Sequence, residues 1–181
     1  SSSNKGQGLF GRIEDATISN LGLKNLDITG YEHVGGLVGR VDFGSKTTNT
    51  STITGCNVTG KVEATYATVG GMVGSLRNGA LILNSYSTAS VTQTGGFNEI
   101  AGGLVGEIAY NGASVKRCYA TGSVDKGSGN EAGGLVGHLW STSNLVKNCY
   151  AKGLVTGGKY VGGLIGENDG ASVKYSYSTG S

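Results

Sequence analysis

A pentapeptide, Gly-Gly-Leu-Val-Gly or a close variant, recurs five times along this chain of 181 residues. The five copies start at Gly35, Gly70, Gly102, Gly133 and Gly162. A shorter copy, Gly8-Leu9-Phe10-Gly11, precedes them at a similar spacing. A unit of about thirty residues cannot bury an apolar face alone, so neighbouring copies must stack and share one core. We therefore predict one repeat domain over residues 1–181, with units at 1–34 (degenerate), 35–69, 70–101, 102–132, 133–161 and 162–181 (partial).

A second block follows each pentapeptide, as in the segment 115–124, Val-Lys-Arg-Cys-Tyr-Ala-Thr-Gly-Ser-Val. One column of this block, the cysteine column, reads Leu26, Cys56, Ser85, Cys118, Cys149 and Ser176. The column three places earlier reads Leu23, Ile53, Ile82, Val115, Val146 and Val173. The column two places after the cysteine column reads Ile28, Val58, Ser87, Ala120, Ala151 and Ser178. Because side chains alternate along a strand, the small and apolar columns at even offsets predict one buried face.

The intervening offsets place hydroxyl-bearing side chains on the opposite face of the same strand. This row contains Tyr86, Tyr119, Tyr150 and Tyr177, followed by Thr88, Thr121 and Thr179. Alternation with β-branched and aromatic residues favours strands. Glycine disfavours helix by about 1 kcal/mol per residue, and the chain contains 35 glycines. The chain is therefore predicted to be all-β.

Stacking of equivalent strands predicts a parallel β-solenoid (β-helix) of about six rungs of about thirty residues, with equivalent residues ~4.8 Å apart. The predicted repeat core consists of Leu37, Met72, Leu104, Leu135 and Leu164 together with Cys56, Cys118 and Cys149. The segments 41–52 and 125–131, where the unit length varies, are predicted surface loops. The alternative is a β-propeller or sandwich of antiparallel hairpins, although a propeller blade usually takes about forty residues and four strands.

The three cysteines share one column, so two of them fall on adjacent rungs. Side chains stacked in parallel point the same way and hardly reach the ~90° torsion of a disulfide. Serine fills the same column at Ser85 and Ser176. We therefore expect the cysteines to be small buried filler.

The pentapeptide followed by a block such as Asn148-Cys149-Tyr150-Ala151-Lys152-Gly153 resembles the GLUG repeat, named for its Gly-Leu-any-Gly core. The resemblance covers nearly the whole chain. GLUG arrays occur in large bacterial surface proteins, including immunoglobulin A1 metallopeptidases and adhesin-like proteins. The resemblance thus implies an extracellular, non-catalytic module at the cell surface. The peptidases carry their chemistry on a separate zinc domain with a His-Glu-any-any-His helix, which this sequence lacks, so no catalytic residue is carried over.

The titratable residues form no pattern that indicates catalysis or a metal. His33 and His138 stand about a hundred residues apart, and both are expected in loops or at strand ends. A catalytic zinc site takes three protein ligands, commonly two of them on one helix. Carboxylates such as Glu107, Glu131 and Glu167 are expected in or near loops, solvated. We predict no catalytic residue, no metal and no cofactor.

The charge and the apolar runs exclude two classes of partner. Lys and Arg number 14 against 12 Asp and Glu, a formal charge of +2, so no strong field attracts nucleic acid or an anionic membrane. No apolar stretch approaches the ~18 residues of a membrane span. Proline is absent and the glycines do not fall at every third position, which excludes collagen. We therefore expect neither nucleic-acid binding nor membrane insertion.

The sequence predicts a non-catalytic extracellular repeat module that acts as a stalk, an adhesin or a ligand-presenting scaffold. The tyrosine and threonine row is the candidate contact face for a host protein or glycan. One alternative is a fibre subunit that self-associates end to end through uncapped solenoid ends. A second is a glycan-active β-helix enzyme. An ice-binding threonine ladder is disfavoured, because Lys152 interrupts a row with one threonine per rung.

Overall fold

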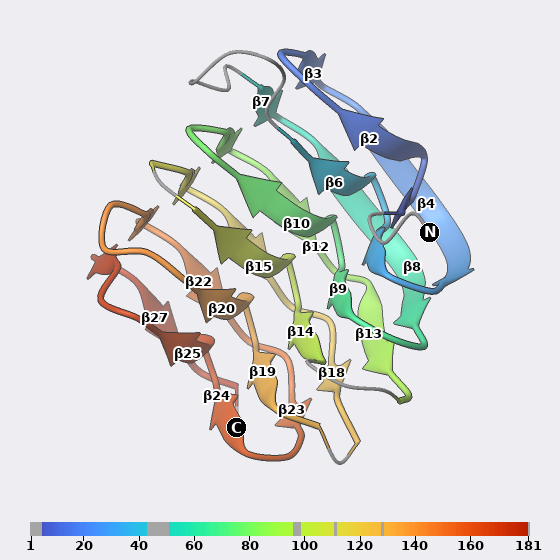
Figure 1. The fold of residues 1–181 in the computed structure, drawn as a ribbon, viewed down its shortest axis with the longest axis vertical. Helices are drawn as coiled ribbons and strands as arrows, with labels where there is room; N and C mark the ends of the chain where they lie inside the picture. Colours follow the sequence, from blue (N-terminus) through green and yellow to red (C-terminus); the bar gives the residue numbers. More distant parts are fainter. Residues whose placement is uncertain (1–4, 43–50, 96–98, 111, 128, 181) are drawn as a thin grey trace.

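The chain coils into a parallel β-solenoid in the computed structural model, which describes residues 5–42, 51–95, 99–110, 112–127 and 129–180 (Figure 1). The described residues form strands and turns without a helix, and all their strand pairs are parallel. The predicted all-β solenoid is thus confirmed, and the alternative of antiparallel hairpins is wrong. No described segment is a helix long and apolar enough to cross a membrane.

Four sheets run along the solenoid, and each turn of the chain, here called a rung, visits all four in the same order. Sheet A contains β1 (Gly6–Gln7), β5 (His33–Gly35), β9 (Thr68–Gly70), β14 (Ile100–Gly102), β19 (Glu131–Gly133) and β24 (Tyr160–Gly162). Sheet B contains β2 (Phe10–Ile13), β6 (Val38–Val41), β10 (Val73–Arg77), β15 (Val105–Ala109), β20 (Val136–Leu139) and β25 (Ile165–Asn168). Six strands in each of these sheets give six rungs.

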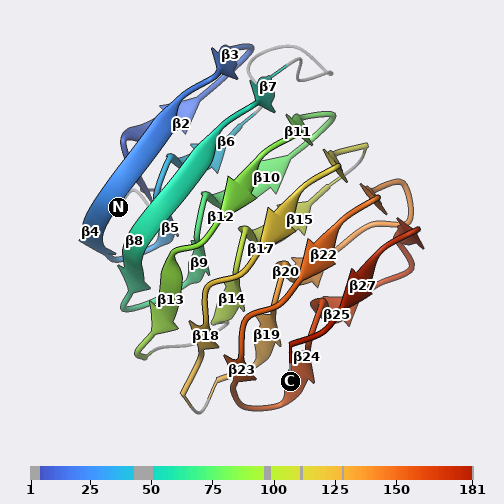
Figure 2. The same ribbon diagram turned by 180° about the vertical axis from the view of Figure 1, so that it is seen from behind.

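The second half of each rung forms the other two sheets. Sheet C contains β3 (Thr17–Ser19), β7 (Thr52–Thr54), β11 (Leu81–Leu83), β16 (Ser114–Lys116), β21 (Leu145–Lys147) and β26 (Ser172–Lys174). Sheet D contains β4 (Gly22–Gly30), β8 (Asn57–Ala64), β12 (Tyr86–Ser87), β13 (Ser90–Gln93), β17 (Tyr119–Ala120), β18 (Val124–Asp125), β22 (Tyr150–Ala151), β23 (Val155–Thr156) and β27 (Tyr177–Ser178). Figure 2 shows sheet D from outside, with strands of successive rungs side by side.

The predicted columns are ladders from the second rung onward. Ile82 pairs with Ile53 on one side and with Val115 on the other. In the next sheet, Ser87 lies between Val58 and Ala120 in the same way. The cysteine column and the column two places after it are buried on rungs two to five, as the alternation predicts, and so is the column of Ile82 on sheet C.

The first rung differs from the predicted alignment. Leu23 pairs with Val58 rather than standing beside Ile53, and Leu26 lies beside Gly60 rather than beside Cys56. The register shifts between Leu23 and Leu26, where one extra residue bulges from β4. Gly60 permits this, because a Cβ there would lie 2.2 Å from the carbonyl oxygen of Leu26. The gapless alignment was wrong here because a bulge leaves no mark in a column of apolar residues.

The pentapeptide makes the tight corner between sheets A and B. A Cβ at Gly102 would lie 1.8 Å from the carbonyl oxygen of Val105, across the turn that joins β14 to β15. A Cβ at Gly106 would lie 2.8 Å from the carbonyl oxygen of Val69 on the preceding rung. Only glycine allows such close backbone approach, so the repeated glycines position sheet A directly against sheet B.

One apolar core runs through the rungs. Leu37, Met72, Leu104 and Leu135 are completely buried, while Leu164, on the last rung, is partly buried. The three cysteines are buried and unpaired. A hydrogen bond with Cys149, together with burial, raises the pKa of the Cys118 thiol, so this thiol stays neutral. The predicted loop 41–52 lies mostly outside the described residues, as does residue 128 of the predicted loop 125–131.

Candidate functional site

Two columns of side chains meet at the corner between sheets A and B, here called the A–B corner. The sheet A column contains His33, Thr68, Ile100, Glu131 and Tyr160. The sheet B column contains Arg12, Arg40, Ser75, Glu107, His138 and Glu167. The backbone repeats from rung to rung, but these side chains do not. The A–B corner is therefore where the chain departs most from its own repeat.

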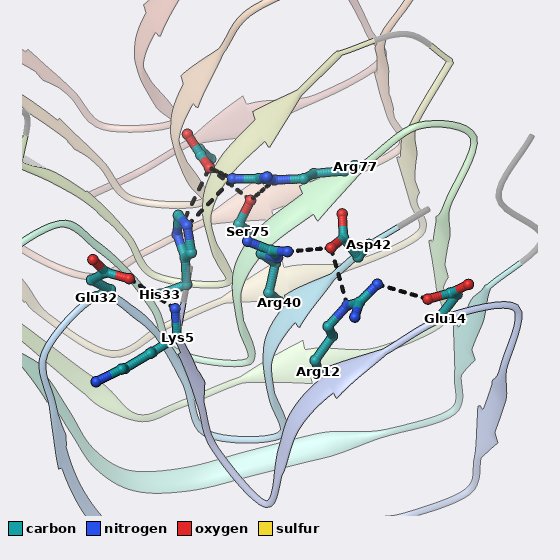
Figure 3. Close-up of polar contacts among 10 residues, drawn as sticks. Lys5, Arg12, Glu14, Glu32, His33, Arg40, Asp42, Ser75 and Arg77 are labelled. Carbon is teal, nitrogen blue, oxygen red and sulfur yellow. Dashed lines mark hydrogen bonds and ion pairs between the residues drawn. The ribbon is translucent and has the colours of Figure 1, made fainter. Parts of the chain in front are cut away.

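Rungs two to four hold a polar network at this corner, the N-terminal cluster of His33, Thr68, Ser75, Arg77 and Glu107, of which Figure 3 labels His33, Ser75 and Arg77. His33 Nδ1 lies 2.6 Å from Thr68 Oγ1. The guanidinium of Arg77 donates to Glu107 Oε1 at 3.2 Å and to Ser75 Oγ at 2.8 Å, and its Nη2 lies 3.3 Å from His33 Nε2. Ser75 Oγ donates to the same Glu107 oxygen at 2.7 Å. Burial lowers the pKa of His33; the nearby Glu107 opposes this shift and Arg77 adds to it. The cluster thus pairs a buried carboxylate with a guanidinium beside a neutral imidazole.

The sheet B column continues toward the first rung with Arg40 and Arg12, which meet the carboxylates of Asp42 and Glu14 (Figure 3). Asp42 lies between two guanidinium groups, in contact with Arg40 and 3.0 Å from Arg12 Nε. Arg12 also reaches Glu14, at 2.7 Å. Each carboxylate of this end of the corner therefore faces an arginine.

Rungs five and six hold a different group at the corner, the C-terminal cluster of Glu131, His138, Glu167 and Asp169. The ligand atoms of the first three residues all lie within 4.8 Å of one another. His138 Nε2 lies 3.2 Å from Asp169 Oδ2, and Nδ1 lies 3.8 Å from Glu167 Oε2. Burial, and next a hydrogen bond with Glu167, raises the pKa of Glu131 to about 7. Three carboxylates thus surround one imidazole, and among the described residues no arginine pairs with them as Arg77 pairs with Glu107 at the other end of the corner.

A pocket of about 500 Å³ opens beside the N-terminal cluster at the carboxyl ends of β10, β15 and β20. Its lining residues are Arg77, Glu107, Ala109, Tyr110, Trp140 and Ser141. Trp140 is 48% exposed, and one face of its ring stacks on His138 at 4.0 Å between centroids. Tyr110 is 53% exposed, has a positive φ of 63°, and carries the Arg77 guanidinium 5.5 Å from its ring centroid. The pocket therefore combines two exposed aromatic rings with a buried ion pair.

The predicted tyrosine and threonine row lies elsewhere, on sheet D (Figure 2). Tyr86, Tyr119, Tyr150 and Tyr177 stack one on another, with centroids 4.6, 4.8 and 5.4 Å apart. The accompanying Thr88, Thr121 and Thr179 are exposed. Because the tyrosine rings cover each other's faces, only ring edges and hydroxyls of the inner tyrosines face outward. A sugar ring therefore has no aromatic face to stack on along the inner part of this row.

The sequence analysis missed the corner clusters. His33 lies at a strand end, as expected, because it is the first residue of β5, whereas His138 lies inside β20 and is only 3% exposed. Glu107 and Glu131 are buried on strands, so the expectation that they are solvated was wrong. One signal was available: Ser75, Glu107, His138 and Glu167 each follow directly after the last glycine of a pentapeptide. That position recurs once per rung, as the apolar columns do, and its polar residues indicate a polar face on sheet B.

Comparison with protein families identifies the repeat. The model of the GLUG motif matches residues 30–63, 97–125 and 157–181. Halomucin of Haloquadratum walsbyi is 38% identical over 183 aligned residues, which cover 96% of this chain and 2% of halomucin. An immunoglobulin A1 protease of Streptococcus sanguinis is 30% identical over 100 residues, which cover 52% of this chain and 5% of the protease. No solved structure matches this chain.

This chain thus corresponds to a small part of each of these long relatives. The chain contains GLUG repeats in these three matched segments.

Proposed function

We propose that this chain is a rigid, non-catalytic spacer and display module in the extracellular part of a much longer protein. The observation that carries this proposal is the parallel strand pairing that continues through all the rungs, interrupted in sheet D by the bulge in β4, with one core shared by all of them. A solenoid of this kind transmits its geometry from rung to rung and sets a fixed distance between its ends. The relatives are consistent with such a role, because the chain matches only 2% and 5% of their lengths.

The relatives also support the extracellular location. One is named for an immunoglobulin substrate, and antibodies of this class act outside cells. The other carries the name of a mucin. The three buried cysteines are unpaired, so the fold depends on its core rather than on disulfides, outside the cell as well as inside it.

The spacing is tested by measuring a distance along one ladder. Ser19 and Lys174 lie in the same column of sheet C, on its first and last strands. Spin labels at S19C and K174C should give one narrow distance near 24 Å between backbones, for five spacings of ~4.8 Å. The native cysteines are buried and should not take the label.

Deletion of residues 102–132 provides the matched variant. Gly102 and Gly133 are register partners, so removal of this unit joins two equivalent backbone positions. We expect a folded protein in which the label distance is shorter by about 5 Å. A broad distance distribution in the intact chain would contradict the spacer proposal.

A second function, saccharide binding, is favoured by the pocket between Tyr110 and Trp140. Aromatic faces stack on sugar rings while charged and hydroxyl groups hydrogen bond to sugar hydroxyls. Here Trp140 keeps one ring face clear of His138, and the Arg77–Glu107 pair and Ser141 line the same pocket. The pocket, rather than the tyrosine row, therefore offers the better contact for a glycan.

Binding at this pocket can be followed directly, because Trp140 is the one tryptophan of the chain. Neutral oligosaccharides should quench or shift its fluorescence, and W140A should lose retention on the same immobilised sugars. Y119A, in the tyrosine row, is the matched aromatic control and should bind like the unchanged chain. The reverse pattern would assign the contact face to the tyrosine row instead.

End-to-end self-association and glycan-processing activity stay predictions. Val161 and Val173, on strands of the last rung, are substantially exposed and would be covered by a further rung. Sedimentation across concentration tests association, which a constant monomer mass would exclude. Release of product from a panel of polysaccharides tests the enzymatic alternative.

A further inference from the structure

We propose that Glu131, His138 and Glu167 form a binding site for a divalent transition-metal ion, for which Zn²⁺ is the probe. The three residues come from three strands, β19, β20 and β25, on the two last rungs. Their ligand atoms lie within 4.8 Å of one another, and Glu131 and His138 are buried. Ligands about 2.1 Å from a shared ion lie roughly 3.4 Å apart in tetrahedral geometry. Small side-chain movements would therefore bring all three atoms into the first coordination shell.

The imidazole of His138 supplies the observation that points to a ligand. Its Nδ1 is buried and has no hydrogen-bond partner among the described residues. Glu167 Oε2 lies 3.8 Å from this nitrogen. A buried nitrogen lone pair that faces carboxylate oxygens is repelled unless a proton or a metal cation lies between them. A bound metal ion satisfies all three groups at once.

Asp169 sets the orientation that such a site requires. Its Oδ2 lies 3.2 Å from His138 Nε2, so it accepts the proton of that nitrogen and leaves Nδ1 as the metal ligand. A histidine that binds a metal through one ring nitrogen usually donates a hydrogen bond from its other ring N–H, often to a carboxylate. We assign Asp169 the role of a positioning residue, outside the coordination shell.

The donor set selects among cations. One imidazole and two carboxylates suit Zn²⁺, Mn²⁺ or Co²⁺, whereas Ca²⁺ and Mg²⁺ prefer all-oxygen sites. Two lysines, Lys126 and Lys159, attract the Glu131 carboxylate through their charge, but Lys126 contacts Glu99 and Lys159 is exposed. At the other end of the corner, Arg77 already supplies the positive charge beside Glu107. The C-terminal cluster is therefore the part of the corner that a metal ion would complete.

Calorimetric titration of the chelator-treated chain with Zn²⁺ tests the site. We expect one ion per chain, weak or undetectable binding of Ca²⁺, and a higher melting temperature with Zn²⁺, since the ion ties rung five to rung six. Co²⁺ should bind at the same stoichiometry and give the visible absorption bands of a low-coordinate site. E167Q should weaken Zn²⁺ binding at least tenfold, and D169N by about 10- to 100-fold with the stoichiometry kept.

H138Q and H33Q form the matched pair, because the chain has two histidines. H138Q should abolish the 1:1 binding, while H33Q should leave it unchanged. Melting curves in chelator show whether each variant folds. If H138Q does not fold, E167Q and D169N still test the site, because they change half-buried or exposed side chains. The proposal is overturned if the chelator-treated chain binds no Zn²⁺, or if E167Q and D169N bind it like the unchanged chain.

Discussion

The two ends of the A–B corner have the same backbone and opposite electrostatics. Glu107 and His138 are direct register partners on adjacent rungs, each one residue after a pentapeptide. Glu107 faces the guanidinium of Arg77 and the hydroxyl of Ser75. His138 instead faces Glu167 and Asp169. The N-terminal cluster thus contains an arginine that pairs with its carboxylate, whereas among the described residues no arginine pairs with the C-terminal cluster, and Lys126 and Lys159 act on Glu131 through their charge alone.

This difference shows how a repeat protein acquires a specific site. The glycines fix where sheets A and B meet, and they are the same on every rung. The residue after the last glycine always points into this corner region, whatever its chemistry. Substitution at one column therefore changes the site without changing the fold, so function in such an array is encoded in the residues that do not repeat.

The largest effect should come from a change in the corner that both clusters share. G102A would place a Cβ 1.8 Å from the carbonyl oxygen of Val105 and 2.8 Å from the nitrogen of Gly137. We expect a loss of about 3 kcal/mol or more in the free energy of unfolding, measured by urea denaturation. G95A is the control, since among the described residues its Cβ would meet only the carbonyl oxygen of Thr65, at 3.9 Å. Equal stability of the two variants would show that close approach at the corner is not what the glycines provide.

The next largest effect should separate the two clusters. R77A leaves the buried carboxylate of Glu107 without its guanidinium, and breaking a buried ion pair in this way costs about 3 kcal/mol. R12A removes an arginine whose side chain is 50% exposed, so less than about 1 kcal/mol is expected. Denaturation of both variants measures the difference. If R77A is as mild as R12A, the N-terminal cluster is solvated and the contrast with the C-terminal cluster disappears.

The fold could be predicted because each of its determinants repeats. The pentapeptide gave the length of the rung, and columns such as Ile53, Ile82 and Val115 gave the buried face and the register. A single repeat would have been compatible with several strand pairings. Several aligned copies are compatible only with parallel stacking of equivalent strands. The failure at the first rung has the same cause, because a single bulge near Leu26 occurs once and has no second copy to reveal it.

The site could not be predicted in the same way. His33 and Glu107 stand 74 positions apart in the sequence, and they meet only because the corner folds sheet A against sheet B. Glu131 and Glu167 come together across two sheets and two rungs. Sequence spacing along one strand carries no information on such contacts. Polar residues in these columns looked like ordinary solvated charges, whereas their burial depends on the adjacent sheet.

The pH dependence of local stability should differ in sign between the clusters in the metal-free chain. The pKa of His33 is lowered on folding, so its contribution is present above the ordinary histidine range and is lost as the pH falls. The pKa of Glu131 is raised from 4.5 to about 7, so its contribution is present at low pH and is lost as the pH rises through about 7. After allowance for solvent screening, the Glu131 effect is about 1–2 kcal/mol.

Hydrogen exchange of individual segments, in the presence of a chelator, can measure both trends in one sample. Between pH 5 and pH 8, protection should rise around β5 and β10 and fall around β19 and β25, after correction for intrinsic exchange rates. H33Q should flatten the first trend, and E131Q the second. Parallel trends in both regions would show that the two clusters share one environment.

The smallest effect concerns the tyrosine row. Its side chain is the same from rung to rung, whereas the side chains of the A–B corner differ. Tyr119 stacks on two neighbouring rings, whereas Tyr177 stacks on one. Y119L keeps an apolar side chain but removes two stacked pairs, so we expect a loss of about 1 kcal/mol, and about half of that for Y177L. Denaturation midpoints give the ratio. A ratio near two means that the stability contributed by a tyrosine in this uniform row depends only on how many rings it stacks on. At the A–B corner, by contrast, the contribution of a side chain depends on the chemistry of its neighbours. If both variants cost the same, the stacking does not stabilise the row, and its hydroxyl edges become the part of the row that needs an explanation.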